Sequence, residues 1–163
     1  MGNLQATFEP VRWLGIGKEK SWSTFGWIFA LIICLVTLIV TLLSMQISAS
    51  VLLRALPLLP ALLIFAAINA FNEEIYFRAS LLSTLFSIIG KTQVLLITVV
   101  FFGLAHYLYG TPSGVIGFLM TGFLAWLLGK SMLETGGLFW AWFIHFLADV
   151  VIFFSYAIAW VQK

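Results

Sequence analysis

The chain has 163 residues, of which 63% are hydrophobic and only 9% are charged, and its mean hydropathy is +1.12. Because soluble domains carry about 25% charged residues, this composition excludes an ordinary soluble protein and predicts an integral membrane protein. The net charge of +2, spread over scattered basic residues, argues against a nucleic-acid partner, and the single cysteine excludes an intramolecular disulfide.

Five apolar stretches follow one another, and each is about as long as the ~20 residues that a helix needs to cross a bilayer, or longer. They cover residues 22–46, 57–89, 92–109, 113–130 and 136–161. We expect an all-α, polytopic transmembrane helix bundle with five to six spans, the sixth arising if the long second stretch breaks. The first stretch is too long for the apolar part of a cleaved signal peptide, so we expect it to stay as an anchor.

Punctuating residues separate these stretches. Pro57 and Pro60 suit the start of the second helix, Gly90-Lys91 closes it, and Gly136-Gly137 precedes the fifth. A short turn over residues 110–113 separates the third and fourth helices. We expect an N-terminal segment, 1–21, followed by one transmembrane domain, 22–163.

Basic residues predict the orientation of the chain. A cytoplasmic N-terminus leaves only Arg54 and Lys163 outside. It places five basic residues on the cytoplasmic side: Arg12, Lys18, Lys20, Lys91 and Lys130. The N-terminus and the segment 1–21 are therefore predicted to be cytoplasmic.

Two adjacent acids and an arginine interrupt the second apolar stretch. An ionisable group at membrane depth costs about 2.5–3.5 kcal/mol, so Glu73, Glu74 and Arg78 are expected to have a function. Glu74 and Arg78 are four residues apart, which favours an ion pair on one helix face. Glu73 is rotated by about 100° and is expected to be available for chemistry. The alternative is that all three form a structural charge cluster.

Glu73 also belongs to a polar stripe with helical spacing. Its members follow one another at steps of four and three residues: Asn69, Glu73, Tyr76, Ser80, Ser83 and Ser87. In a bilayer such a stripe indicates either a seam between helices or the wall of a water-filled cavity. Its continuity favours a cavity through which water reaches Glu73.

Two histidines occupy later apolar stretches. Phe102 lies one turn before His106, and Asp149 lies one turn after His145, where its carboxyl can orient the imidazole. At 1.5 Å per residue, the acids and the histidines come to similar depths, within one or two helical turns. We therefore expect Glu73, His106 and His145 to surround one water molecule within the membrane.

These residues form three motifs that resemble the family of CAAX prenyl proteases and bacteriocin-processing proteases. The family pattern is Glu-Glu-x-x-x-Arg, Phe-x-x-x-His and His-x-x-x-Asn or Asp. Here the motifs run over Glu73–Arg78, Phe102–His106 and His145–Asp149, in that order and each in an apolar helix. The resemblance covers about residues 57–155, the expected catalytic core.

The resemblance implies an intramembrane endopeptidase of the bacterial plasma membrane. Glu73 would act as the general base, His106 would help to orient the water, and Glu74 and Arg78 would hold the geometry. His145 and the residue one turn later would stabilise the oxyanion. The substrate would be a membrane-associated protein or peptide: a CAAX-like tail, a pheromone or bacteriocin precursor, or a C-terminal sorting segment.

Asp149 leaves two alternatives open. An asparagine at this position could donate to an oxyanion, whereas an ionised aspartate would repel it. Either Asp149 is protonated, or it orients His145 and leaves His145 to donate.

We expect no cofactor, with a divalent metal such as zinc as the alternative. Glu73, His106, His145 and Asp149 would then be its ligands, although the His-Glu-x-x-His spacing of common zinc proteases is missing. Two other function classes also fit intramembrane acids and histidines. One is a non-catalytic immunity or binding protein on the same scaffold, and the other is a proton-coupled transporter. The residues do not predict an oligomeric state.

Overall fold

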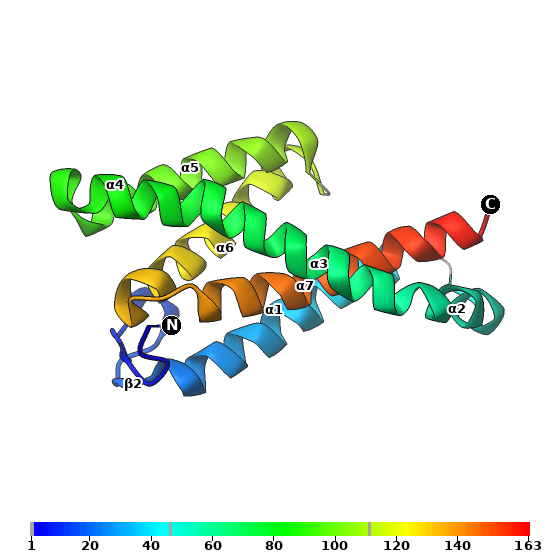
Figure 1. Ribbon diagram of the computed structural model, residues 1–163, viewed down its shortest axis with the longest axis horizontal. Helices are drawn as coiled ribbons and strands as arrows, with labels where there is room; N and C mark the ends of the chain where they lie inside the picture. The colour runs from blue at the N-terminus through cyan, green and yellow to red at the C-terminus, as the bar shows by residue number, and fades with distance from the viewer. Residues whose placement is uncertain (1, 46, 111) are drawn as a thin grey trace. The chain divides into compact units, whose positions relative to one another are not determined.

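The computed structural model describes residues 2–45, 47–110 and 112–163 and confirms the all-α class (Figure 1). Within these residues, five helical stretches are long and apolar enough to cross a membrane. Apart from the second stretch, they are α1 (Trp22–Ser44), α5 (Lys91–Tyr109), α6 (Gly114–Thr135) and α7 (Phe139–Val161). Residue 46, the predicted end of the first stretch, and residue 111, in the predicted turn, lie outside the described residues.

The second stretch is one helical run over Ala49–Ile89. It consists of α2 (Ala49–Ala55), the 3-10 turn η2 (Leu56–Leu58), α3 (Leu59–Glu74), the π turn η3 (Ile75–Ala79) and α4 (Ser80–Ile89). Its predicted start at Pro57 is wrong, because Ser48 caps the helix N-terminus by accepting a 3.4 Å hydrogen bond from the Val51 amide. Pro57 and Pro60 stand where the run changes from α to 3-10 geometry and back.

The fourth stretch continues past its predicted end at Lys130. The ammonium group of Lys130 contacts Glu134 one turn later, so the charged residues are accommodated within the helix. The helix then ends at Gly136, whose φ of +63° is the left-handed conformation that favours glycine at this position. α7 accordingly begins at Phe139.

The chain divides into two compact units, and we describe each by itself. The first unit comprises Met1–Phe25 and Asn72–Ala141, and the second comprises Gly26–Phe71 and Trp142–Lys163. The boundaries fall within α1, α3 and α7.

Close packing of α5 against α6 dominates the first unit. A Cβ atom added at Gly103 would lie 2.8 Å from the Phe118 ring, and one at Gly129 would lie 2.8 Å from Leu95. Glycine at these positions therefore lets the two helices approach closely, as small residues do in membrane bundles.

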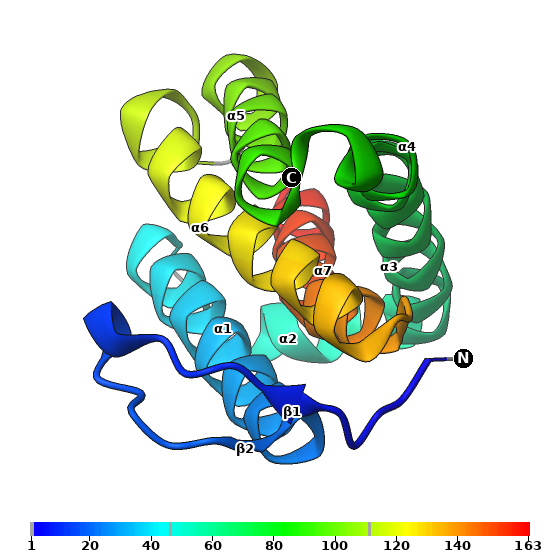
Figure 2. The same cartoon turned by 90° about the vertical axis from the view of Figure 1, so that its left-hand side faces the viewer.

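A short hairpin, absent from our predictions, opens the first unit (Figure 2). Its strands β1 (Thr7–Phe8) and β2 (Lys20–Ser21) pair antiparallel, with Thr7 opposite Ser21, and the 3-10 turn η1 (Arg12–Leu14) lies between them. The Asn3 amide donates to the Thr135 carbonyl at 2.7 Å. The N-terminal segment thus lies against the end of α6.

Charged side chains tie the hairpin to the two neighbouring helices. Lys91, at the start of α5, pairs with Glu9 and lies 3.4 Å from Glu134. Glu134 also accepts a 2.8 Å hydrogen bond from the Trp22 indole. The hydrogen bond from Lys91 holds the pKa of Glu9 below its usual value, since it stabilises the carboxylate.

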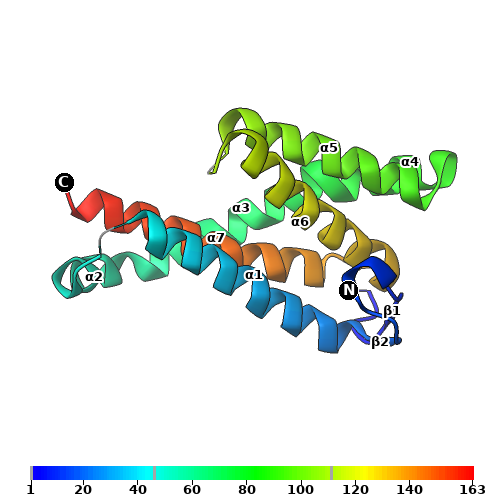
Figure 3. The same ribbon diagram turned by 180° about the vertical axis from the view of Figure 1, so that it is seen from behind.

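The second unit contains an apolar cluster where α2 meets the C-terminal part of α7 (Figure 3). Its buried members are Val51, Ala55, Ala157 and Ile158. Further along, the Trp142 indole of α7 donates to the Ala67 carbonyl of α3 at 3.0 Å. This bond fixes α7 against α3 next to the motif His145–Asp149.

Candidate active site

The predicted pair of Glu74 and Arg78 is present and completely buried. Arg78 donates from Nη1 to Oε1 of Glu74. Glu73, half-buried on the preceding position of α3, also attracts the guanidinium electrostatically. Both acids of the motif therefore act on the same cation, with Glu74 making the direct contact.

The π turn η3 begins immediately after Glu74 and contains Arg78. A π turn holds one residue more than an α turn, so it displaces every later side chain around the helix axis. π turns are frequent at functional sites. No residue type in Ile75–Ala79 indicates this geometry in advance.

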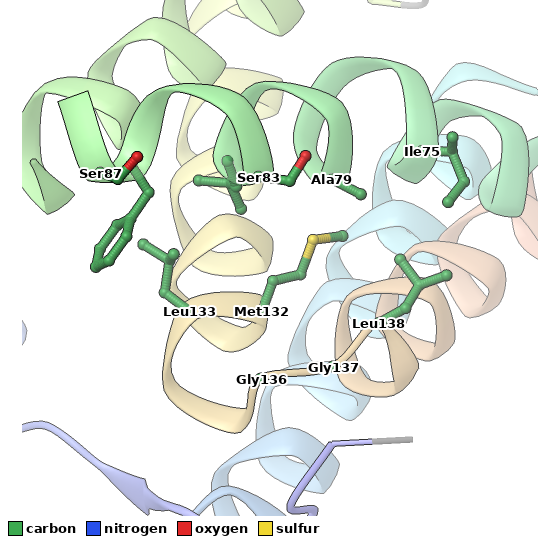
Figure 4. Close-up of a pocket in the computed structure, with 11 residues that line it drawn as sticks. Ile75, Ala79, Ser83, Ser87, Met132, Leu133, Gly136, Gly137 and Leu138 are labelled. Carbon is green, nitrogen blue, oxygen red and sulfur yellow. The ribbon is translucent and has the colours of Figure 1, made fainter. Parts of the chain in front are cut away.

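Two serines of the predicted polar stripe line a pocket. They are Ser83 and Ser87, and the pocket has a volume of about 390 Å³ (Figure 4). The other walls are mostly apolar and include Met132, Leu133 and the Gly136-Gly137 turn. That water reaches Glu73 along this stripe stays a prediction.

His106 is half-buried on α5 and is held by its own helix. Its Nδ1 lies 3.1 Å from the carbonyl oxygen of Phe102, and its ring centroid lies 4.4 Å from that of Phe102. A carbonyl only accepts, so this bond places a proton on Nδ1 and makes Nε2 the acceptor of the neutral imidazole. The expected packing of Phe102 beside His106 is confirmed.

Phe102 also joins the first motif to the second. The Arg78 guanidinium carbon lies 4.1 Å from the centre of the Phe102 ring, and Phe77 packs edge-on against it at 5.3 Å. Residues from the π turn and from α5 thus share one buried aromatic ring. Sequence reasoning missed the contact between Arg78 and Phe102, because spacing along one helix gives no information about a neighbour on another helix.

The third motif lies in the second unit. Nε2 of His145 lies 3.5 Å from Oδ1 of Asp149, and both side chains are buried. Asn69 of α3 donates to the other oxygen of Asp149 at 3.1 Å. The expected pairing of Asp149 with His145 is confirmed, and Asn69, which we had placed only in the polar stripe, is an additional member.

The predicted site residues are divided between the two units. Glu73, Glu74, Arg78 and His106 belong to the first unit, and His145 and Asp149 belong to the second. Within the residues that the structure describes, no three His, Cys, Asp or Glu side chains form a group that could hold a metal ion. A common site of Glu73, His106 and His145 stays a prediction.

Comparison with known proteins gives one family. The model of the type II CAAX prenyl endopeptidase Rce1-like family matches residues 54–151, a range that contains all three motifs. The comparisons with curated proteins and with solved structures gave no match. Because the matched region covers more than half of the chain, the protein belongs to the Rce1-like family of type II CAAX prenyl endopeptidases.

Proposed function

We propose that the protein is an intramembrane endopeptidase in which Glu73 activates water to hydrolyse a peptide bond. The observation that carries this proposal is the buried ion pair of Glu74 and Arg78, joined through Phe102 to His106, within the region matched by the family. Burying a charged side chain within a membrane is energetically unfavourable, so this pair indicates a function beyond packing.

In the proposed reaction, the Glu73 carboxylate takes a proton from water while the water oxygen attacks the carbonyl carbon of the scissile bond. His106 accepts a hydrogen bond from the water through Nε2 and so orients it, because its Nδ1 proton is committed to the Phe102 carbonyl. The carbon–nitrogen bond then breaks, and the proton on Glu73 passes to the leaving amine. Glu74 and Arg78 fix the position of Glu73 and do not exchange protons.

We assign oxyanion stabilisation to His145. Asp149 accepts from Asn69 and faces Nε2 of His145, so it can orient the imidazole. This supports the alternative in which Asp149 serves His145 and His145 donates to the oxyanion. With Nε2–H turned to Asp149, the donor is Nδ1–H, which requires both ring nitrogens of His145 to be protonated.

The proposed substrate is a protein or peptide associated with the membrane. A CAAX-like tail, a pheromone or bacteriocin precursor and a C-terminal sorting segment are the candidates. The proposed location is the bacterial plasma membrane with the N-terminus in the cytoplasm. The packing of the N-terminal segment against Lys91 and Thr135 supports a common side for it, the start of α5 and the end of α6.

The test uses the purified full chain in lipid nanodiscs with a quenched fluorescent CAAX-type peptide, farnesylated or not, and with candidate precursor peptides. Cleavage is followed by fluorescence, and the products are mapped by mass spectrometry. Glu73→Gln is expected to reduce turnover by about 10²–10⁴-fold, the usual contribution of a general base. The matched control is Glu19→Gln, the same change at an exposed position.

The outcomes separate the alternatives. Normal cleavage by Glu73→Gln overturns the general-base assignment, and no cleavage of any peptide by the wild-type chain favours a non-catalytic binding protein. We expect a strong chelator to leave cleavage unchanged. Inhibition that is reversed by added zinc would instead assign Glu73, His106, His145 and Asp149 to a metal site.

A further inference from the structure

We infer that Phe102 is a positioning residue that couples the ion pair of Glu74 and Arg78 to His106 through the face of its ring. This inference rests on the proposed function for its effect on catalysis. Its structural part, the coupling of Arg78 to His106, is testable without any substrate.

The first observation concerns the guanidinium of Arg78. The side chain is completely buried, and only Nη1 makes a hydrogen bond to Glu74. Among the described residues, Nε and Nη2 have no hydrogen-bond partner. A buried cation with so few hydrogen bonds depends on its other contacts, and the Phe102 ring at 4.1 Å supplies one. The negative face of an aromatic ring stabilises a cation most strongly where water is excluded.

The second observation concerns His106. Two parts of Phe102 contact it: the ring packs at 4.4 Å from the imidazole, and the carbonyl oxygen lies 3.1 Å from Nδ1. Phe102 therefore determines both the orientation of the imidazole and the nitrogen that carries its proton. A shift of this residue would change the position of Nε2, the atom to which we assign the water.

The third observation is that the Phe102 ring has little room to move. It is completely buried, and Phe77 packs edge-on against it at 5.3 Å. The next residue on α5, Gly103, lies so close to Phe118 of α6 that a Cβ atom there would clash at 2.8 Å. The backbone of α5 is thus held at this level by α6. A rigid ring between a cation and an imidazole transmits the position of one to the other.

A series of fluorinated phenylalanines at position 102 tests the inference with little change in shape. One, two and three ring fluorines progressively weaken the negative face of the ring. With the farnesylated CAAX-type reporter peptide, we expect kcat to fall stepwise, by about tenfold to a hundredfold over the series, while KM stays constant. The control is the same series at Phe101, the exposed neighbour on α5, where no change is expected.

Nuclear magnetic resonance of the imidazoles provides a readout that does not require activity. The chain has only two histidines, so selective ¹⁵N and ¹³C labelling gives two sets of signals, assigned with a His145→Gln variant. Both the fluorinated series at 102 and Arg78→Lys are expected to shift the His106 signals. Phe101→Leu is expected to leave them unchanged.

The inference fails if kcat and the His106 signals are constant across the fluorinated series at 102. It also fails if Arg78→Lys leaves the His106 signals unchanged. If those signals shift while Glu73→Gln still cleaves the peptide, the coupling stands and the general-base assignment is lost. If no peptide is cleaved, the His106 signals alone decide.

Discussion

The two clusters of this protein hold a buried carboxylate in different ways. In the first unit, Glu74 is paired with a full positive charge on Arg78, which in turn packs against an aromatic ring. In the second unit, Asp149 is held by the amide of Asn69 and faces the imidazole of His145. An acid paired with a permanent cation is restrained in position, whereas an acid held by an amide and an imidazole restrains the imidazole.

This difference separates structural support from chemistry. Arginine stays charged under all conditions, so the pair of Glu74 and Arg78 can fix geometry without taking part in proton transfer. Histidine exchanges protons readily, so in the proposed reaction the orientation that Asp149 gives to His145 bears directly on the hydrogen bond that we assign to His145 and the oxyanion. The comparison predicts that breaking the pair of Glu74 and Arg78 mainly lowers folding stability, whereas altering the second cluster lowers turnover with little effect on stability.

The largest expected effect is on the stability of the first cluster. Arg78→Ala leaves the completely buried Glu74 without its cation, which costs about 3–5 kcal/mol and should strongly reduce accumulation in the membrane. The measurement is the amount of folded protein and its thermal unfolding midpoint in detergent.

A double replacement isolates the cause of that effect. Arg78→Met combined with Glu74→Gln removes both charges while keeping similar volume, and it should accumulate better than Arg78→Ala. If the double variant accumulates no better, the stranded charge of Glu74 is not the reason for the loss.

A smaller effect, on turnover, is expected in the second cluster. Asp149→Asn keeps one acceptor oxygen and replaces the other with an NH₂ group. That NH₂ group then faces Asn69 or His145, the groups that the two carboxylate oxygens face in the wild type. We expect kcat to fall about tenfold, because His145 loses part of its orientation, with little change in the unfolding midpoint. A kcat that rises would mean that the residue at 149 donates to the oxyanion, and thus that Asp149 acts in its protonated form.

Sequence patterns predicted what depends on a single helix. The pairs Glu74 with Arg78, Phe102 with His106, and His145 with Asp149 each lie one turn apart, and the helix geometry alone brings their members together. The apolar stretches likewise predicted the five helices, since length and hydropathy are sufficient for a span.

What the patterns missed depends on a second helix or on backbone irregularity. The contact between Arg78 and Phe102 and the bond from Asn69 to Asp149 each join two helices. The π turn at Ile75–Ala79 is a backbone irregularity of which the residue types give no sign. The α6 extension to Thr135 was missed because the pairing of Lys130 with Glu134 makes a charged turn compatible with a buried helix end.

The smallest expected effect is on the pH dependence of the N-terminal hairpin, which holds a third charged cluster outside the two sites. The pKa of Glu9 is lowered because Lys91 donates a hydrogen bond to its carboxylate. A carboxyl whose pKa is lower in the folded state stabilises that state above its unfolded pKa of 4.5, and this contribution is lost as the pH falls through the lower, folded pKa. Acidification below pH 4.5 should therefore loosen the N-terminal hairpin.

Hydrogen exchange followed by mass spectrometry measures this loosening directly. The Trp22 amide, which donates to the Ala6 carbonyl at 2.8 Å, should exchange faster at acid pH once the intrinsic pH dependence is subtracted. Glu9→Gln should show faster exchange already at neutral pH and little further change on acidification, since it lacks the titrating group. An equal pH response in the wild type and in Glu9→Gln would assign the effect to another acid, with Glu134, which shares Lys91, as the next to replace. Because Glu9 is largely exposed, water and salt screen its ion pair, so the change should be confined to the hairpin and leave the helices protected.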